Sequence, residues 1–284
     1  MNTNLTLLSS TFDTSIVLKV DFMKLRILSD IHCDINSGQN TNFDFAPDDF
    51  VICCGDISGD RITTEKWINN NLKQGIAVGG NHLGYTHFTY DKEESLNLSI
   101  KYLQNKFSGP VHFLENQSLV IDNICFIGCI LFTDFHLYGT PDSCRFIAQK
   151  YLNDFRNVKF YEKGKLRTIS TEDQLALHKK SINFIEKTCQ KYKDKKIIIV
   201  THHSPSLKSI SEEYKNDLLS AAFASNLEYL FERYPNIKLW CHGHVHNSVD
   251  YKLGNARVIA NPLGYGNENT NFRKEGVLIN TDDL

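Results

Sequence analysis

Side chains that bind metal ions stand at five places along the chain, each directly after a short apolar run. These segments are Asp30-Ile31-His32, Gly55-Asp56, Gly79-Gly80-Asn81-His82, His202-His203 and His242-Gly243-His244-Val245-His246. Carboxylate mixed with imidazole suits Mn²⁺, Fe, Zn²⁺ or Ni²⁺, whereas Ca²⁺ and Mg²⁺ prefer oxygen ligands throughout. The segments therefore predict a site for a transition-metal ion.

The number of candidate ligands indicates two ions rather than one. The seven candidates are Asp30, His32, Asp56, Asn81, His202, His244 and His246. Two ions that share one bridging carboxylate would receive about four ligands each and keep room for water and substrate. Such a pair, about 3.5–4 Å apart, is the arrangement used for phosphoryl displacement. His203 competes with His202, which we prefer because it comes first after the apolar run, and we do not expect His242 to be a ligand.

The apolar runs before these segments are expected to be strands, because they are short and rich in β-branched residues. Strands are predicted at residues 25–28, 50–54, 76–78, 196–200, 237–241 and 276–280, with two more in 119–132 and a hairpin over 251–259. Helices are predicted at 63–73, 93–107, 171–192 (opened by a capping box of Thr171 and Gln174) and 216–234. Alternating strands and helices predict one α/β domain, whose site lies at the carboxyl ends of the strands.

Composition narrows the class of protein. Of the 284 residues, 31 are Lys or Arg and 33 are Asp or Glu, so net charge provides no footprint for non-specific nucleic-acid binding. The eight cysteines form no CxxC pair, and we expect reduced thiols in a cytoplasmic protein. No apolar stretch reaches the about 20 residues of a membrane span. We expect an N-terminal extension at 1–22, a single domain at 23–284 and a lid insert at about 133–171.

The motifs Asp-x-His, Gly-Asp, Gly-Asn-His, Thr-His and Gly-His-x-His, in this order, resemble the calcineurin-like metallophosphoesterase family over about residues 24–265. The resemblance implies a four-layer α+β fold, in which two mixed β-sheets pack face to face between helices. It implies that Asp56 bridges two ions, with His82 outside the ligand set and beside the phosphate. The implied ligands are Asp30, His32, Asp56 and His246 for the first ion, and Asp56, Asn81, His202 and His244 for the second.

The expected reaction is attack on phosphorus by a hydroxide shared by the two cations, which lower the pKa of bound water. Asn81 would also offer its amide to the phosphate, and His82 would donate to a phosphate oxygen or protonate the leaving alkoxide. Many relatives place Asp or Glu after Gly-Asn-His to orient the histidine, but this chain has Leu83. Asp134 or a backbone carbonyl is the candidate substitute.

These residues predict a phosphodiesterase or phosphatase acting on a small molecule or nucleotide, with Mn²⁺ as the first choice of metal and Fe, Zn²⁺ or Ni²⁺ as alternatives. In the insert, Arg145 and Arg156 are candidate substrate contacts or surface salt-bridge partners, and His203 is a further candidate contact. The alternatives are a nuclease and a catalytically inactive scaffold that binds a protein partner. Segments such as 152–156 and 261–265 resemble a bacterial or phage-associated subgroup of the family whose substrate is poorly defined.

Overall fold

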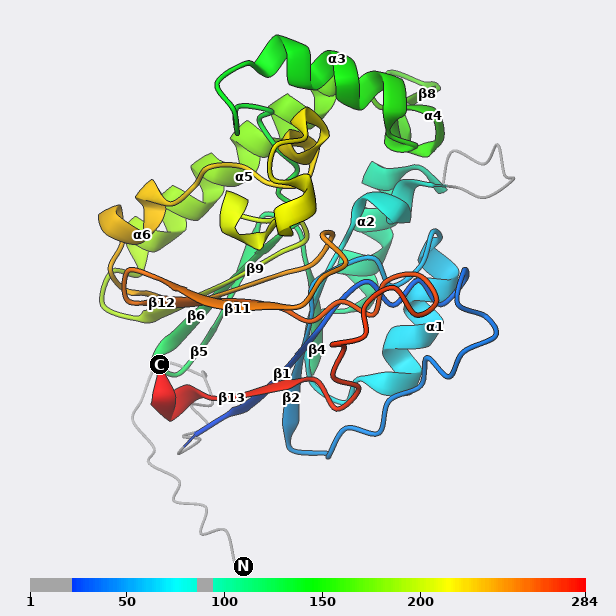
Figure 1. Cartoon of the computed structure of the whole chain (residues 1–284). Coiled ribbons are helices and arrows are strands. Elements are labelled where there is room, and N and C mark those ends of the chain that lie inside the picture. Colours follow the sequence, from blue (N-terminus) through cyan, green and yellow to red (C-terminus); the bar gives the residue numbers. More distant parts are fainter. Residues whose placement is uncertain (1–21, 86–93) are drawn as a thin grey trace, which may run out of the picture.

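Two β-sheets and their covering helices make up the computed structural model of the protein, which describes residues 22–85 and 94–284 (Figure 1). The expected N-terminal extension lies outside these residues, apart from its last position. The first sheet has the strand order β13-β1-β2-β3-β4. Its members are β1 (Lys24–Leu28), β2 (Asp49–Cys53), β3 (Gly75–Val78), β4 (Val111–Leu114) and the antiparallel edge strand β13 (Val277–Asn280).

The second sheet has the order β11-β12-β10-β9-β6-β5. Its members are β5 (Gln117–Ile121), β6 (Ile124–Cys129), β9 (Lys196–Thr201), β10 (Ile237–His242), β11 (Val249–Leu253) and β12 (Ala256–Ala260). The four strands β12, β10, β9 and β6 run parallel, and β11 and β5 pair antiparallel at the two edges. Both sheets are therefore mixed, as the family resemblance implies.

Alternating side chains of the same strands enter two different cores. In β1, Leu25 and Ile27 face the space between the sheets, whereas Leu28 packs in the cluster beneath the helices. In the core between the sheets, the rings of Phe50 and Phe126 stack with their centroids 5.2 Å apart. Because successive strand residues point to opposite faces, each sheet is covered on both sides. The predicted four-layer fold is confirmed.

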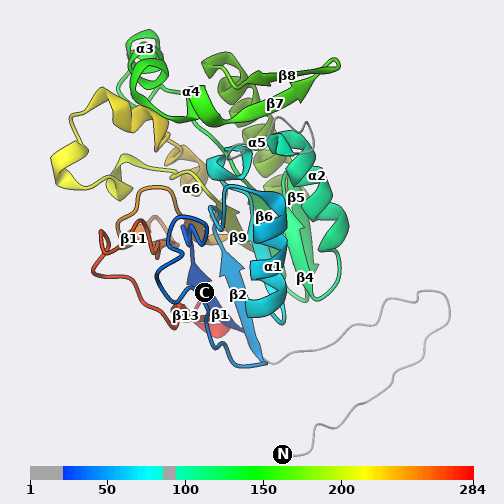
Figure 2. The same ribbon diagram turned by 90° about the vertical axis from the view of Figure 1, so that its right-hand side faces the viewer.

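Helices α1 (Arg61–Asn71) and α2 (Leu96–Lys106) cover the outer face of the first sheet, and α5 (Thr171–Lys191) and α6 (Tyr229–Arg233) cover the second (Figures 1 and 2). The capping box of α5 is formed by Ser170 and Asp173, one residue before the predicted pair, because Ser170 is the last residue with extended backbone. No helix of the described residues is both long and apolar enough to cross a membrane.

The predicted helix at 216–234 is wrong. The chain forms the 3-10 helix η5 (Leu218–Ala222), then returns to an extended path before α6. Here Ser225 donates its backbone N–H to the carbonyl of Ser204, and Ala224 forms a parallel β-bridge with Ser204. This pairing with a distant segment takes the backbone hydrogen bonds that a continuous helix would need.

The insert at 133–170, here called the cap, has its own secondary structure. It contains α3 (Pro141–Tyr151), α4 (Asp154–Asn157) and the hairpin β7 (Lys159–Glu162) with β8 (Lys165–Thr168) (Figure 2). Phe135, Cys144 and Ala148 pack in a small buried cluster against Ala221 and Ala222 of η5. The cap thus packs against residues 206–223, here called the 3-10 segment, which contain η3 (Leu207–Ser209), η4 (Glu212–Tyr214) and η5.

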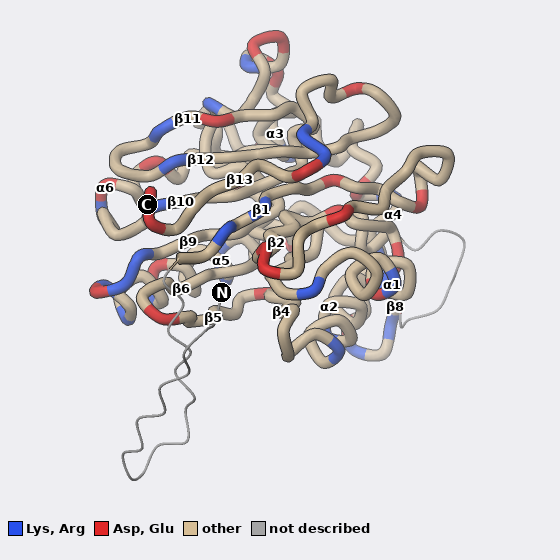
Figure 3. Tube along the Cα trace, turned by 90° about the horizontal axis from the view of Figure 1, so that it is seen from below, with Lys and Arg blue, Asp and Glu red and all other residues tan. Residues whose placement is uncertain are grey.

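Charged residues of both signs alternate along the chain rather than separating by sign. Figure 3 shows Lys and Arg interspersed with Asp and Glu over the face opposite the cap. In the described part of the chain the eight cysteines, all free, are buried except Cys33, which is partly buried. On the face opposite the cap, the described residues form no cationic stripe of the kind that binds nucleic acid.

Candidate metal centre

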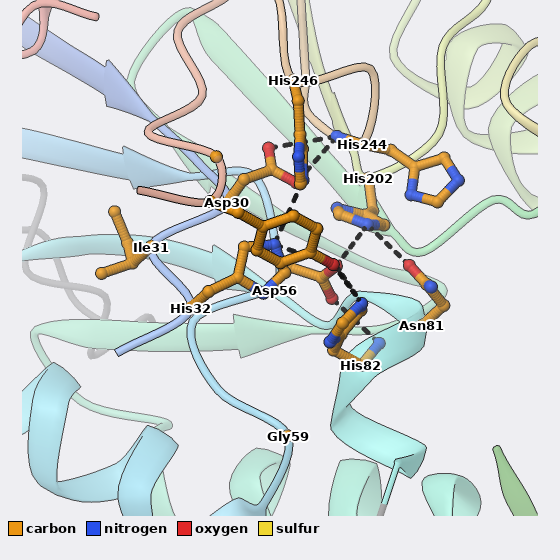
Figure 4. Close-up of polar contacts among 12 residues, drawn as sticks. Asp30, Ile31, His32, Asp56, Gly59, Asn81, His82, His202, His244 and His246 are labelled. Atoms are coloured by element: carbon orange, nitrogen blue, oxygen red, sulfur yellow. Dashed lines mark hydrogen bonds and ion pairs between the residues drawn. The ribbon is translucent and has the colours of Figure 1, made fainter. Parts of the chain in front are cut away.

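The candidate ligands gather where strands of both sheets end (Figure 4). Asp30 and His32 follow β1, Asp56 follows β2, and the 3-10 helix η1 (Asn81–Gly84) follows β3. From the second sheet, His202 follows β9 and the histidines at 244 and 246 follow β10. Ile31, between two candidate ligands, points away from the cluster into the core. The parallel strands therefore deliver these side chains to one point, as the sequence predicts.

The backbone at this point is strained. Five non-glycine residues of the cluster have positive φ: Asp30 (54°), His32 (43°), Asp56 (50°), His244 (68°) and His246 (49°). Non-glycine residues seldom adopt this region, because each one costs about 1–3 kcal/mol of backbone strain. Residues that do adopt it tend to lie at functional sites. Because the chain turns sharply where the strands end, two residues of one short segment, such as Asp30 and His32, can both direct their side chains to the same centre.

Two glycines, Gly80 and Gly243, leave the space that the carboxylates of Asp56 and Asp30 occupy. A Cβ atom on Gly80 would lie 1.9 Å from Asp56 Oδ1, and one on Gly243 would lie 2.4 Å from Asp30 Oδ2. Gly80 and Gly243 are therefore needed for close approach rather than for an unusual backbone angle. Of the three glycines beside the ligands, Gly55, Gly80 and Gly243, Gly55 alone has a positive φ, of 92°.

The first ligand group consists of Asp30, His32 and His246. The Nε2 atoms of His32 and His246 lie 3.2 Å apart, and His246 Nε2 lies 3.4 Å from Asp30 Oδ1. Ligand atoms bound to one ion at about 2.1 Å lie about 3.0 to 3.4 Å apart in octahedral or tetrahedral geometry. These donors therefore fit a single divalent cation, and Asp56 Oδ2 stands farther off, at 3.9 Å from His32 Nε2.

The second ligand group consists of Asp56, His202 and His244, with Asn81 beside them. His202 Nε2 lies 3.2 Å from Asp56 Oδ2 and 3.0 Å from Asn81 Oδ1, which again fits two ligands of one ion. His244 Nε2 is buried without a hydrogen-bond partner among the described residues. Because an unpaired buried nitrogen is unfavourable, its position favours a bound cation as its partner.

Backbone groups hold the ligands in orientation. Asp56 Oδ1 accepts from the His82 backbone N–H at 3.0 Å, and both oxygens of Asp30 accept from the His244 N–H, at 3.0 and 3.1 Å. His202 Nδ1 lies 2.9 Å from the Cys54 carbonyl, so Nδ1 carries the hydrogen and Nε2 faces the cluster. Such outer contacts fix the ring and its tautomer before a metal arrives.

Opposite charges dominate the electrostatics. Burial raises the pKa of Asp56, but the nearby His202 and His82 outweigh it and hold that pKa well below its usual range. Burial also raises the pKa of Asp30, and His246 overcomes it through a hydrogen bond and its charge. For His32, burial is dominant and lowers the pKa to about 4. Burial lowers the pKa of His202 and His246 as well, but Asp56 and Asp30 outweigh it and raise these pKa values to about 9 and about 10. The carboxylates are thus ionised, and a metal would have to displace a proton from each of these two rings.

His82 lies against the cluster between two tyrosines. Its Nε2 is 2.9 Å from the Tyr265 hydroxyl, and its ring stacks on Tyr85 at 3.9 Å between centroids. Leu83 is buried in the core beneath the helices, so the side chain after His82 points away from the site. Asp134 accepts the backbone N–H of His136 instead of contacting His82. Tyr265 therefore contacts the ring nitrogen that faces the cluster, and the other ring nitrogen of His82, Nδ1, is buried with no hydrogen-bond partner among the described residues.

Asp154 is a site residue that sequence reasoning missed. It is buried on α4 of the cap and accepts from Asn81 Nδ2 at 2.8 Å, from the Tyr85 hydroxyl at 2.6 Å and from Gln174 at 3.3 Å. By taking the Asn81 amide hydrogens, Asp154 turns Asn81 Oδ1 toward His202. The segment 152–156 stood out in the sequence, but nothing in it indicated contact with a residue 73 positions earlier.

The weaker candidates lie elsewhere. Arg145 contacts Thr171 Oγ1 at 3.3 Å and pairs with Glu172, and Arg156 donates to the Lys150 carbonyl at 2.6 Å. Neither lines the cavity described below. His203 is buried with its ring 4.2 Å from that of His244 and its Nδ1 3.3 Å from the Ile130 carbonyl. It supports the His244 ring from behind and is not on the cavity wall.

A cavity of about 400 Å³ opens beside the cluster. Its floor contains Asp56, Asn81, His82, His244 and His246, and the cap and the 3-10 segment form its walls. The volume lies within the range of sites for small organic ligands. A metal centre at the bottom of a cavity of this size is suited to a small substrate with one end bound to the ions.

Comparison with known proteins identifies the family. The model of the calcineurin-like phosphoesterase family matches residues 23–248. Uncharacterized protein L509 of Acanthamoeba polyphaga mimivirus is 26% identical over 270 residues, 87% of this chain and 93% of the relative. The structure of phosphopantetheinyl hydrolase (PptH) from Mycobacterium tuberculosis matches with a TM-score of 0.66 and 16% identity, over 87% of this chain and 91% of that one. A putative 5'-nucleotidase from Staphylococcus aureus matches with a TM-score of 0.43 and 14% identity, over 84% and 48%. The chain belongs to the calcineurin-like phosphoesterase family and is a phosphoric ester hydrolase.

Proposed function

We propose that the protein hydrolyses phosphoester bonds of a small molecule or nucleotide with two divalent ions, Mn²⁺ being the first choice. The observation that carries the proposal is the pair of adjacent ligand groups, one around Asp30 and one around His202, with Asp56 between them. One ion would be held by Asp30, His32 and His246. The other ion would be held by Asn81, His202 and His244, and Asp56 would bind both ions. When bound, the two ions supply Lewis acidity that lowers the pKa of water and offsets charge on the phosphate oxygens.

The residues of the chain then have distinct tasks. Asp56, ionised and held by the His82 backbone N–H, presents its other oxygen to both ligand groups. Asn81 is turned by Asp154 so that its carbonyl oxygen faces His202. His82 lines the cavity and can pass a proton to a leaving oxygen or donate to phosphate.

The scaffold and nuclease alternatives receive less support. A scaffold that has lost catalysis has no need of the strained backbone and the unpaired His244 nitrogen, and the grouping of the seven candidate ligands also supports an enzyme. A nuclease that binds without sequence preference needs a cationic track, and the described residues that line the cavity beside the metal centre include no Lys or Arg. We therefore infer a small substrate.

The deciding experiment measures metal content and turnover together. Protein purified with Mn²⁺ is expected to bind two ions per chain and to hydrolyse p-nitrophenyl phosphate or its bis ester, and the preferred ester separates phosphatase from phosphodiesterase. Asp56→Asn should lose most of the second equivalent of metal, because the bridge is removed, and activity should fall with it. Asp194→Asn is the matched control, since Asp194 is exposed in the turn after α5 and lies outside the cavity and both ligand groups. Two equivalents retained by Asp56→Asn would refute the shared-ligand assignment, and wild-type protein without turnover in any metal would refute the enzyme.

A further inference from the structure

The walls of the cavity carry no cationic side chain among the residues that the structure describes. The cap contributes Tyr151, Leu152, Asn153 and the buried Asp154, and the 3-10 segment contributes neutral residues and Asp217. Phosphate sites that recognise several phosphate groups use Arg and Lys for this purpose. Among the described lining residues, the positive charge expected to face a substrate is therefore that of the metal centre itself.

Cations on the surrounding elements are directed to other partners. Lys208 pairs with Glu228 at 3.2 Å, and Lys215 with Glu212, which lies in η4. Arg145 and Arg156 are held outside the cavity, and Lys150, whose Nζ lies 5.0 Å from the centre of the Tyr151 ring, does not line it. The carboxylates that line the cavity are those of Asp56, Asp154, Asp217 and Glu268, and Glu268 contacts His246 Nδ1.

Aromatic surface takes the place of charge. Tyr151 at the end of α3 is 57% exposed, Tyr214 at the end of η4 is 54% exposed, and both line the cavity from different elements. Phe223 and Leu219 add apolar surface deeper on the same side, where the Phe223 ring stacks on His244 at 4.6 Å. Large apolar side chains left exposed around one cavity mark a surface that a ligand covers.

Building on the proposed function, we propose that the cavity selects phosphoesters whose alcohol portion is uncharged and partly apolar or aromatic, and that it rejects esters with additional negative charge. The phosphate end would occupy the metal centre, and the alcohol portion would lie between Tyr151 and Tyr214. An additional carboxylate or phosphate would face Asp217 and Glu268 with no cation to pair with. Like charges at short range in a partly enclosed cavity disfavour binding and provide selectivity.

The test compares substrates that differ only in remote charge. Hexyl phosphate and 6-(phosphonooxy)hexanoate have the same chain and nearly the same leaving oxygen, but the second ends in a carboxylate. With the Mn²⁺-supplied protein we expect kcat/KM to be at least about tenfold higher for hexyl phosphate, and the ratio to shrink at high salt. Equal values, or a preference for the carboxylate, would overturn the proposal.

Variants test the walls. The double variant Tyr151→Ala with Tyr214→Ala should raise KM for hexyl phosphate by about tenfold and leave methyl phosphate unaffected, because only the longer ester reaches the tyrosines. Tyr229→Ala, an exposed tyrosine of α6, is the matched control and should change neither. Ser211→Lys places a cation on the wall and should bring the carboxylate ester to within about threefold of hexyl phosphate.

Binding of non-hydrolysable analogues separates failure of this proposal from failure of the proposed function. Calorimetric titration with hexylphosphonate and 6-phosphonohexanoate should show the same preference for the neutral chain. If no ester is hydrolysed but hexylphosphonate binds more tightly, the enzyme assignment fails and the selectivity of the cavity stands. If both esters are hydrolysed equally well, the selectivity fails and the enzyme stands. If neither phosphonate binds and no ester is hydrolysed, both fail.

Discussion

Asp154 connects the cap to the metal centre through a single buried carboxylate. Its oxygens accept from Asn81, Tyr85 and Gln174, so three donors converge on one side chain. Burial raises its pKa, and the hydrogen bonds from Tyr85 and Asn81 oppose that rise. The orientation of Asn81 as a ligand therefore depends on a residue from a different part of the chain.

Asp154→Asn should weaken Mn²⁺ binding at the second ligand group by about 10–100-fold, because an amide offers one acceptor oxygen to three donors. The measurement is the dissociation constant of the weaker ion, followed by electron paramagnetic resonance of free Mn²⁺. Tyr85→Phe is the control: it removes one donor and leaves the carboxylate on Asn81, so affinity should stay close to that of the wild type. An unchanged dissociation constant in Asp154→Asn would show that Asn81 needs no such support.

His82→Ala should keep both ions and lower kcat by about 10²–10⁴-fold if the histidine protonates the leaving group. The loss should then be larger for an alkyl ester than for a p-nitrophenyl ester, whose leaving oxygen needs little protonation. Equal losses for both esters would instead assign His82 to phosphate binding. Loss of metal would make it a ligand, which its grouping with His32 and Asp56 also permits.

At the scale of elements, the strands that position the site and an insert after them could be predicted, but the helices and the hairpin inside the cap were not. The strands that carry the ligands are nearly continuous apolar runs because both faces are covered, and this pattern is visible locally. The hairpin of β7 and β8 is only partly buried and lacks such a run, whereas α3 is amphipathic and starts with Pro141, a local signal that the sequence prediction missed. The helix predicted at 216–234 failed because the bridge between Ser204 and Ala224 is a long-range contact.

Glu115 joins the two sheets at the ends of β4 and β6. Its carboxylate accepts from the Ile130 backbone N–H at 2.7 Å. Burial raises its pKa from 4.5 to about 7, against the opposing effect of that hydrogen bond. The folded protein therefore keeps the proton where the unfolded chain releases it, and stability falls as pH rises from about 4.5 to 7.

Glu115→Gln should remove this part of the pH dependence, because the amide keeps the acceptor oxygen and never ionises. Urea unfolding measures the free energy of unfolding at pH 5 and at pH 8. Between these two pH values, the difference between variant and wild type should shift by about 1–3 kcal/mol in favour of the variant. Glu213→Gln changes an exposed glutamate of η4, and its free energy of unfolding should change with pH as that of the wild type does. A constant difference between Glu115→Gln and the wild type at all pH values would exclude the titration of Glu115.

At the scale of the whole molecule, the two sheets are held by the core between them. Phe126 of β6 is fully buried and stacks on Phe50 of β2, so one aromatic pair spans both sheets. The metal centre needs ligands from both sheets, since Asp30 and Asp56 come from the first and His202 and His244 from the second. Packing of the sheets and assembly of the site are therefore linked.

Phe126→Ala should lower the free energy of unfolding by about 3–5 kcal/mol, because it leaves a cavity between the sheets. Phe146→Ala, on α3 and 66% exposed, is the control and should change stability by less than about 0.5 kcal/mol. Both values come from urea denaturation of the metal-free protein. Similar losses in the two variants would contradict a core that lies between the sheets.

The sequence by itself determined the strands that carry the candidate ligands, the residues at their carboxyl ends and, through the order of its motifs, the family, whereas β4 (Val111–Leu114) was not predicted. Those features are local, because apolar periodicity and short motifs can be read without knowing what packs against them. Only the tertiary structure decided that Asp154 orients Asn81, that tyrosines surround His82 and that the cavity has no cation on its described walls. The contact of Asp154 with Asn81 spans 73 residues and that of Tyr265 with His82 spans 183, and such contacts leave no periodic trace in the sequence.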